Sequence, residues 1–293
     1  MSLSITPQRS EAEQPVASFT GEGAYHGSSK TKVRDERLSV PQEEAATVLD
    51  RYVQRADPAF ADFAATFPNR YEVCRRLPVP TQEQVKADQV TFCWRPFAQA
   101  LQEAGPLTRS VLQAMEPLLE RKKAHAYVDA KIQYFAAGDL PVDSRLWHID
   151  GSIAIRDGRA RALGHELLHD LRTRLSGSVP PPSYLAYQSS FHCATEFAVA
   201  PVTVVIPDFL PAFDLLDERV RAADPVRVAQ PAGSIVRFDG LSLHRAVPAR
   251  DAGWRLWIRC VETDREVDVG SSVSRCYGTV FRPGLPLAAP PKP

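Results

Sequence analysis

The chain has 293 residues, carries 35 Lys and Arg residues against 35 Asp and Glu residues, and is 44% hydrophobic. This length allows one large domain or two small ones with a substantial core. The neutral charge balance gives no reason to expect nucleic acid or an anionic membrane as the main partner. The five cysteines are scattered and form no CxxC pair, and no signal peptide is recognisable, which together favour the cytoplasm.

The predicted elements begin with a polar stretch, residues 1–38, which we expect to be a flexible N-terminal arm. A helical supporting region is predicted over residues 39–124. Its first part, residues 40–102, has apolar residues at helical spacing, and Gly105-Pro106 then breaks the chain. A second helix follows, with an apolar face over residues 107–119.

From His125 onward, short runs rich in β-forming residues are separated by Gly, Pro and Asp. Strands are predicted within residues 124–135, 146–155, 183–192, 196–206, 233–238, 253–263 and 273–281. One helical insert near residues 162–175 interrupts them, and a Pro-rich tail occupies residues 283–293. The pattern predicts a mainly β sandwich or barrel core over residues 125–282, with the N-terminal helices packed on one sheet in a single composite domain.

A histidine and a carboxylate stand two residues apart in one of these strands. Side chains alternate along a strand, so His148 and Asp150 point to the same face and can meet one metal ion. His244, which follows the strand at residues 233–238 and a short turn, can supply a third ligand. Two histidines and one carboxylate form the facial triad of non-haem Fe(II), which leaves positions open for a co-substrate and dioxygen.

An arginine follows His244 after eleven residues, inside the strand predicted over residues 253–263. Alternation places Arg255, Trp257 and Arg259 on one face of this strand. Arginines that point toward a closed apolar core need anions to meet. Because the guanidinium group matches a carboxylate with two hydrogen bonds, Arg255 is a candidate site for a carboxylate ligand.

This arrangement resembles the Fe(II)/2-oxoglutarate-dependent dioxygenases, such as the phytanoyl-CoA hydroxylase-like and taurine dioxygenase-like enzymes. The matching stretches are KIQYFAAGDLPVDSRLWHIDG and PAGSIVRFDGLSLHRAVPARDAGWRLWIR, and the resemblance covers roughly residues 125–265. It implies a double-stranded β-helix core, which is a jelly roll of the cupin type. It also implies that His148, Asp150 and His244 bind Fe(II), with 2-oxoglutarate and dioxygen as co-substrates.

The resemblance implies roles for further residues. Arg255 would bind the distal carboxylate of 2-oxoglutarate, and Gln133 or Thr195 would add a hydrogen bond to it. Arg259 would bind an anionic group of the prime substrate, with Trp257 lining the pocket. The family's halogenases lack the carboxylate ligand, so the Asp residue of the triad favours hydroxylation or desaturation. We expect the substrate to be a small, acidic molecule.

Two other functions compete with this interpretation. The sequence His165-Glu166-Leu167-Leu168-His169 matches the H-E-x-x-H zinc motif, which makes a zinc metallopeptidase one alternative. Its continuation lacks the third ligand of the extended motif and its surroundings are β-rich, which favours an ordinary surface helix. The other alternative is a non-catalytic β-barrel binding module in which the His/Asp set holds no metal.

Overall fold

The computed structural model describes residues 62–88, 91–141, 145–150, 153–156, 159–162, 175–178, 180–206, 214–264, 266–268 and 280. The chain divides into two compact units, Met1–Asp35 and Glu36–Pro293, and all described residues lie in the second. The predicted N-terminal arm and the first part of the helical region, as far as residue 61, lie outside the described residues. The same holds for most of the helical insert, for the strand at residues 273–281 except Val280, and for the tail.

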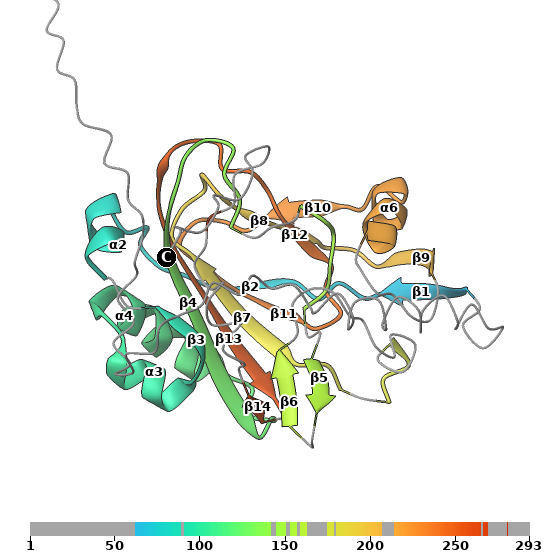
Figure 1. The fold of residues 1–293 in the computed structure, drawn as a ribbon, viewed down its shortest axis with the longest axis horizontal. Helices are drawn as coiled ribbons and strands as arrows, with labels where there is room; N and C mark the ends of the chain where they lie inside the picture. The colour runs from blue at the N-terminus through green and yellow to red at the C-terminus, as the bar shows by residue number, and fades with distance from the viewer. Residues whose placement is uncertain are drawn as a thin grey trace, which may run out of the picture. The chain divides into compact units, whose positions relative to one another are not determined.

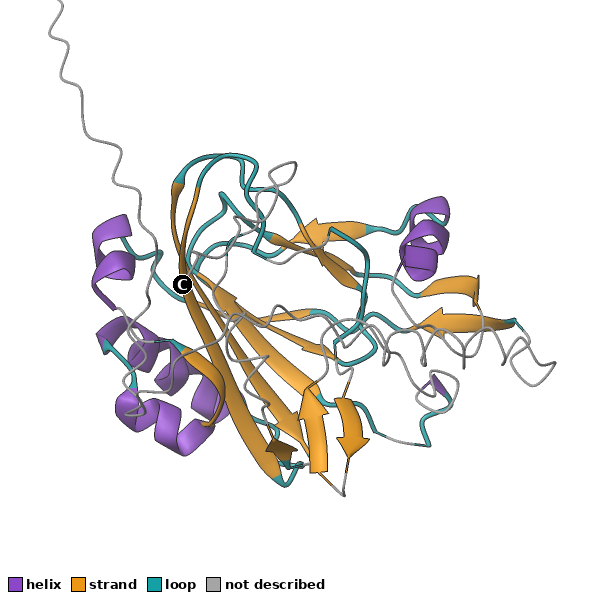
Figure 2. Cartoon of the chain, in the orientation of Figure 1, coloured by secondary structure: helices purple, strands orange, loops and turns teal. Residues whose placement is uncertain are grey.

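The fold is mainly antiparallel β-sheet with a few helices, as predicted (Figure 2). The largest sheet has six strands in the order β2-β11-β7-β13-β4-β3 (Figure 1). Their bounds are β2 Glu72–Arg76, β11 Ser234–Asp239, β7 Ser183–Gln188, β13 Gly253–Thr263, β4 His125–Phe135 and β3 Phe92–Pro96. At its centre β13 and β4 pair over eleven residues, from Gly253 opposite Phe135 to Thr263 opposite His125. The face of this pair that carries Arg255 and Arg259 forms the floor of the candidate site.

Three α-helices and a 3-10 turn cover one face of this sheet. They are α2 Gln82–Asp88, α3 Phe97–Glu103, α4 Pro106–Met115 and η2 Glu116–Leu118. Leu256, Ile258 and Cys260 point from β13 into the core beneath them, as strand alternation requires. The opposite face of β13, which carries Arg255 and Arg259, is therefore turned away from the helices.

The helical region predicted over residues 39–124 is mixed in its described part. Three short strands lie in it: β1 (Phe63–Phe67), β2 and β3. Each pairs with a strand much later in the chain, β1 with β9 (Val202–Ile206), β2 with β11 and β3 with β4. The prediction of helix was wrong there because this pairing, which local spacing does not report, decides the conformation.

A second, three-stranded sheet has the order β10-β8-β12. Its strands are β10 Arg227–Ala229, β8 Thr195–Ala198 and β12 His244–Ala246. Phe197 of β8 packs on Phe238 of β11, with 5.1 Å between the ring centroids, so this sheet faces the inner side of the large one. The predicted strand at residues 196–206 is divided into β8 and β9 around Pro201, which has no N–H for a sheet ladder.

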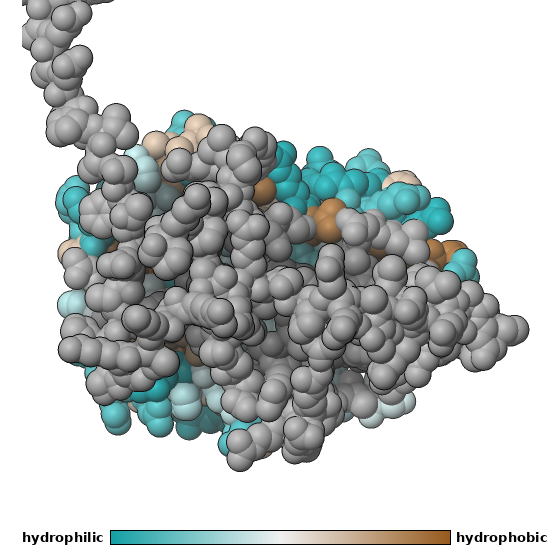
Figure 3. All heavy atoms as spheres, viewed as in Figure 1, coloured by the Kyte–Doolittle hydropathy of each residue, from teal (hydrophilic) through white to brown (hydrophobic). Residues whose placement is uncertain are grey.

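Two smaller groups complete the described structure. The strands β5 (Ile153–Arg156), β6 (Arg159–Ala162) and β14 (Val267–Asp268) form a third sheet. Helix α6 (Asp214–Ala222) buries Leu216 and Val220, and its exposed side contributes to the hydrophilic surface at the upper right of Figure 3. None of the described helices has the length and apolar character needed to cross a membrane.

Candidate metal centre

His148 and His244 are paired through their backbones. The amide of each residue donates to the carbonyl oxygen of the other, with N···O distances of 3.0 Å. Their rings lie 4.3 Å apart between centroids. The predicted strand at residues 146–155 is thus reduced to this bridge, followed by a bend at Asp150, and β5 begins only at Ile153. The two imidazoles nevertheless reach one site from neighbouring segments.

Both histidine rings are held by a backbone carbonyl two residues earlier in the chain. Nδ1 of His148 lies 2.8 Å from the oxygen of Leu146, and Nδ1 of His244 lies 2.9 Å from the oxygen of Ser242. Because a carbonyl oxygen only accepts, the ring proton belongs on Nδ1 and the lone pair on Nε2. Metal-binding histidines are oriented in this manner by the partner of their second nitrogen.

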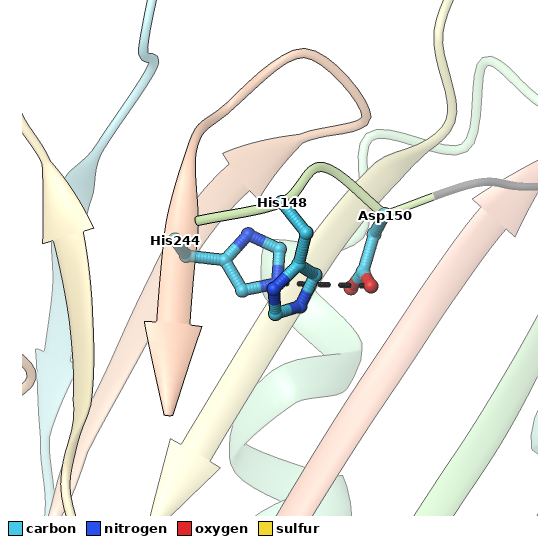
Figure 4. A group of neighbouring side chains, drawn as sticks. All are labelled: His148, Asp150 and His244. Atoms are coloured by element: carbon cyan, nitrogen blue, oxygen red, sulfur yellow. Dashed lines mark ion pairs between the residues drawn. The ribbon is translucent and has the colours of Figure 1, made fainter. Parts of the chain in front are cut away.

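Asp150 completes a compact group with the two histidines, as Figure 4 shows. One potential ligand atom from each of the three residues lies within 4.8 Å of the others, and all three residues are buried. Oδ1 of Asp150 is 3.7 Å from Nε2 of His244. The three residues predicted as metal ligands are therefore brought together, and the group could hold a metal ion.

Arg259 contacts the other oxygen of this carboxylate. Its Nη1 donates to Oδ2 of Asp150, while Nη2 and Nε donate to Oδ2 of Asp129 at 2.7 and 3.2 Å. Burial acts to raise the pKa of Asp150, but the Arg259 guanidinium outweighs it, together with His244 and His148 when their rings are protonated, and that pKa is held well below its usual range. The aspartate of the site is therefore an ionised carboxylate, the form that binds metals.

Arg255 lies further along the same face of β13, with 2% of its surface exposed. Its only hydrogen bond in the described part of the chain runs from Nη1 to the sulfur of Cys193, at 3.4 Å, and its buried Nε has no partner. Burial lowers the pKa of this guanidinium, an effect that the Cys193 thiol offsets only in part. Gln133 stands directly opposite Arg255 on β4, so these two predicted residues are neighbours.

The remaining predicted residues lie around this floor. Trp257 is half-buried, with the ammonium of Lys131 5.1 Å from its ring centroid and the guanidinium of Arg259 at 5.5 Å. Burial is the main cause that lowers the pKa of Lys131 to about 8. Thr195 begins β8, and its amide donates to Oε1 of Gln188 at 3.2 Å. Thr195 also pairs with Ala246, which places it beside β12, the strand that carries the second histidine.

Sequence reasoning missed two charged residues of this floor, Asp129 and Lys131. Both stand at alternate positions with Gln133 on β4, so strand alternation alone would have placed them on the inward face. The H-E-x-x-H segment at residues 165–169 lies outside the described residues.

No family model matches the chain, and neither a curated protein nor a solved structure does. The donor set of the candidate metal centre is two imidazole nitrogens and one carboxylate, with no thiolate among the three. Such a set suits a divalent transition metal that keeps open coordination positions.

Proposed function

We propose that the chain is an Fe(II)- and 2-oxoglutarate-dependent oxygenase that hydroxylates or otherwise oxidises a C–H bond of a small, acidic molecule. One observation carries the proposal: His148, Asp150 and His244 converge within 4.8 Å in a buried group. Two histidines and one carboxylate with open positions are typical of non-haem Fe(II) oxygenases. The same three residues would hold the metal.

The protonation states of these residues fit a metal. A metal ligand must be a deprotonated carboxylate or an imidazole with a lone pair directed at the ion. Asp150 is held ionised, and the carbonyl partners of both Nδ1 atoms direct Nε2 of His148 and His244 to the site. When bound, Fe(II) with 2-oxoglutarate and dioxygen would couple oxidative decarboxylation, which yields succinate and CO2, to oxidation of the substrate, with dioxygen as the oxidant of both.

The strand order supports a double-stranded β-helix core. Strands β11, β7, β13 and β4 are consecutive in the large sheet, while β10, β8, β12 and the His148 segment are consecutive in the facing one. A jelly roll consists of eight strands in two facing antiparallel sheets, and these eight segments match that number. The two histidines belong to one of these sheets and Arg255 and Arg259 to the other.

Arg255 is the proposed anchor for the distal carboxylate of 2-oxoglutarate. A buried guanidinium whose Nε has no partner in the part of the chain that the structure describes fits a ligand that accepts two parallel hydrogen bonds. Arg255 and Arg259 are four residues apart on β13, which corresponds to about 13 Å along the strand at 3.3 Å per residue. Arg259 lies at the end nearer the proposed metal, because it contacts Asp150. Lys131 adds a third cation to this face and supports an anionic substrate.

The experiment is a binding and turnover assay on the full chain. Calorimetry with Co(II) and 2-oxoglutarate under nitrogen measures binding, and succinate formation with Fe(II) in air measures uncoupled turnover. We expect both in the wild type and neither in His148→Ala or His244→Ala. His125→Ala, a substitution outside the site, serves as the matched control and should keep both. Absence of 2-oxoglutarate binding in the metal-loaded wild type would overturn the proposal, and stoichiometric zinc lost on His169→Ala would favour the peptidase instead.

A further inference from the structure

We propose that Arg259 and Asp129 form a positioning pair that holds Asp150 so that only one of its oxygens binds the metal. The inference rests on the proposed metal site and assigns Arg259 a role other than contact with substrate. The two carboxylate oxygens of Asp150 have different partners. Oδ1 faces Nε2 of His244 at 3.7 Å, and Oδ2 accepts the hydrogen bond from Nη1 of Arg259.

This division decides how many coordination positions stay open. A carboxylate that gives both oxygens to a six-coordinate ion occupies two positions, so that two imidazoles and such a carboxylate leave only two. A carboxylate bound through one oxygen leaves three, enough for a two-point co-substrate and dioxygen. Because Arg259 occupies Oδ2, Asp150 is restricted to Oδ1. The arginine thereby preserves the third position.

Arg259 is itself fixed from the opposite side by Asp129, its direct neighbour on β4. Asp129 is completely buried, and its Oδ2 accepts from both Nη2 and Nε of the arginine. Its Oδ1 accepts the backbone amide of Trp94 at 2.7 Å. Trp94 has a φ of 50° and lies where the register of β3 is irregular, an uncommon backbone conformation for a residue other than glycine. The bulge thus supplies the donor that orients Asp129.

Aromatic rings complete the enclosure of the guanidinium. The ring centroids of Trp94, Tyr184 and Trp257 lie 5.7, 5.5 and 5.5 Å from its central carbon. All three nitrogens of Arg259 already donate to carboxylates. These hydrogen bonds use three of the five N–H groups of the guanidinium, and a substrate anion could accept from those three only by displacing Asp129 or Asp150. The contacts therefore favour a positioning role for Arg259 over a substrate clamp.

Arg237 on β11 offers a matched control. It also stands between two carboxylates, with Nη1 3.6 Å from Glu72 and Nε 3.7 Å from Glu120. Its side chain is 17% exposed, against 13% for Arg259. Neither of its carboxylate partners belongs to the candidate metal centre. Arg237→Gln therefore removes a comparable ion pair without touching a proposed ligand.

The test measures Co(II) binding by calorimetry and the visible d–d spectrum of the Co(II) protein, using the full chain. We expect Arg259→Gln to weaken Co(II) binding by about 10–100-fold, the usual effect of losing a partner that orients a metal ligand. We also expect its spectrum to change, because Oδ2 of Asp150 becomes able to approach the ion. Arg259→Lys should recover part of the affinity, and Arg237→Gln should keep both affinity and spectrum.

The outcomes separate this inference from the proposed function. If the wild type binds no Co(II), the metal site itself fails. If the wild type binds Co(II) and Arg259→Gln keeps both its affinity and its spectrum, only the positioning role fails. Loss of the Arg259 guanidinium leaves Asp129 as a buried charge, which endangers folding. Should Arg259→Gln not fold, the double variant Asp129→Asn with Arg259→Gln has no such charge and carries the same test.

Discussion

Replacing Arg255 with Met should stabilise the protein while weakening its proposed co-substrate site. The guanidinium is buried, and among the described residues its one hydrogen bond goes to a sulfur atom while its Nε has no partner. A buried polar group without a partner costs about 1–3 kcal/mol. Methionine is apolar and unbranched, and it can keep the packing against Phe135, whose ring centroid lies 5.9 Å from the guanidinium. The free energy of unfolding without 2-oxoglutarate should therefore rise by about 1–3 kcal/mol.

Adding 2-oxoglutarate should benefit the wild type far more than the variant. A ligand present at 100 times its Kd stabilises the folded state by about 2.7 kcal/mol. Truncating one partner of a buried charge pair costs at least about 2 kcal/mol of binding, or roughly 30-fold in Kd. At the same ligand concentration, Arg255→Met then gains less than about 1 kcal/mol. Urea unfolding followed by circular dichroism, with Co(II) in every sample, measures both effects.

Arg237→Met provides the opposite expectation from the same chemical change. Arg237 contacts two carboxylates and donates to the carbonyl of Leu118, so its removal should lower the free energy of unfolding by about 1.5–3 kcal/mol. If Arg255→Met is destabilised to a similar extent, the guanidinium of Arg255 is neutralised within the protein. That result would refute the reasoning that it awaits an anion.

Three further predictions concern the metal, pH and the helical layer. His148→Ala and His244→Ala should each weaken Co(II) binding by more than about 100-fold in calorimetry, because losing a direct ligand lowers metal affinity more than losing a partner that orients one. A loss of affinity below about tenfold would contradict their role as ligands. The pKa of Lys131 is lowered from 10.5 to about 8 in the folded protein. Between pH 8 and 10.5 the unfolded chain therefore binds more protons at this residue than the folded chain does. The free energy of unfolding of the wild type should accordingly rise with pH through this range. Lys131→Met should lack this gain, and below pH 8 it should be more stable than the wild type by at most about 3 kcal/mol. Urea unfolding at pH 7.5 and 9.5 measures the difference in stability between the two proteins. A difference that does not shrink as pH rises would count against the lowered pKa. The side chain of Asp88 accepts hydrogen bonds from the amides of Leu107 and Thr108 at the start of α4. Asp88→Ala should therefore lower the free energy of unfolding by about 2 kcal/mol, and Asp88→Asn by less. Equal losses for the two variants in chemical denaturation would argue against capping.

Strand alternation predicted the parts of the fold whose period of two is uninterrupted. Strand β13 runs over the predicted residues, Gly253–Thr263, because Leu256, Ile258 and Cys260 alternate with the residues of the other face. The short strands β1 and β2 were missed because their partners are distant in sequence: Phe63 pairs with Ile206, more than 140 residues later. Local spacing carries no information on such pairing.

The candidate site was predictable to the extent that its residues are close in sequence or follow a strand period. His148 and Asp150 were expected to share a face of a regular strand. They do meet at one site, but through a single bridge to His244 and a bend. The spacing of His-x-Asp therefore predicted the convergence, although the local structure that produces it differs. The carbonyl partners of both Nδ1 atoms lie two residues earlier in the chain, and no sequence pattern indicated these local hydrogen bonds.

Alternation gave Arg255 and Arg259 the same face, yet it could not distinguish their environments. The distinction arises from the register between β13 and β4, which sets the neutral Gln133 opposite Arg255 and the carboxylate of Asp129 opposite Arg259. A shift of two residues would keep every side chain on its face but would put other residues opposite both arginines, for example Lys131 opposite Arg255 and Tyr127 opposite Arg259. With the observed register, Arg259 is neutralised by protein carboxylates, whereas Arg255 has none within reach of a hydrogen bond among the described residues. One strand thus carries both the residue proposed to fix the metal ligand Asp150 and the residue proposed to bind a carboxylate from outside the protein.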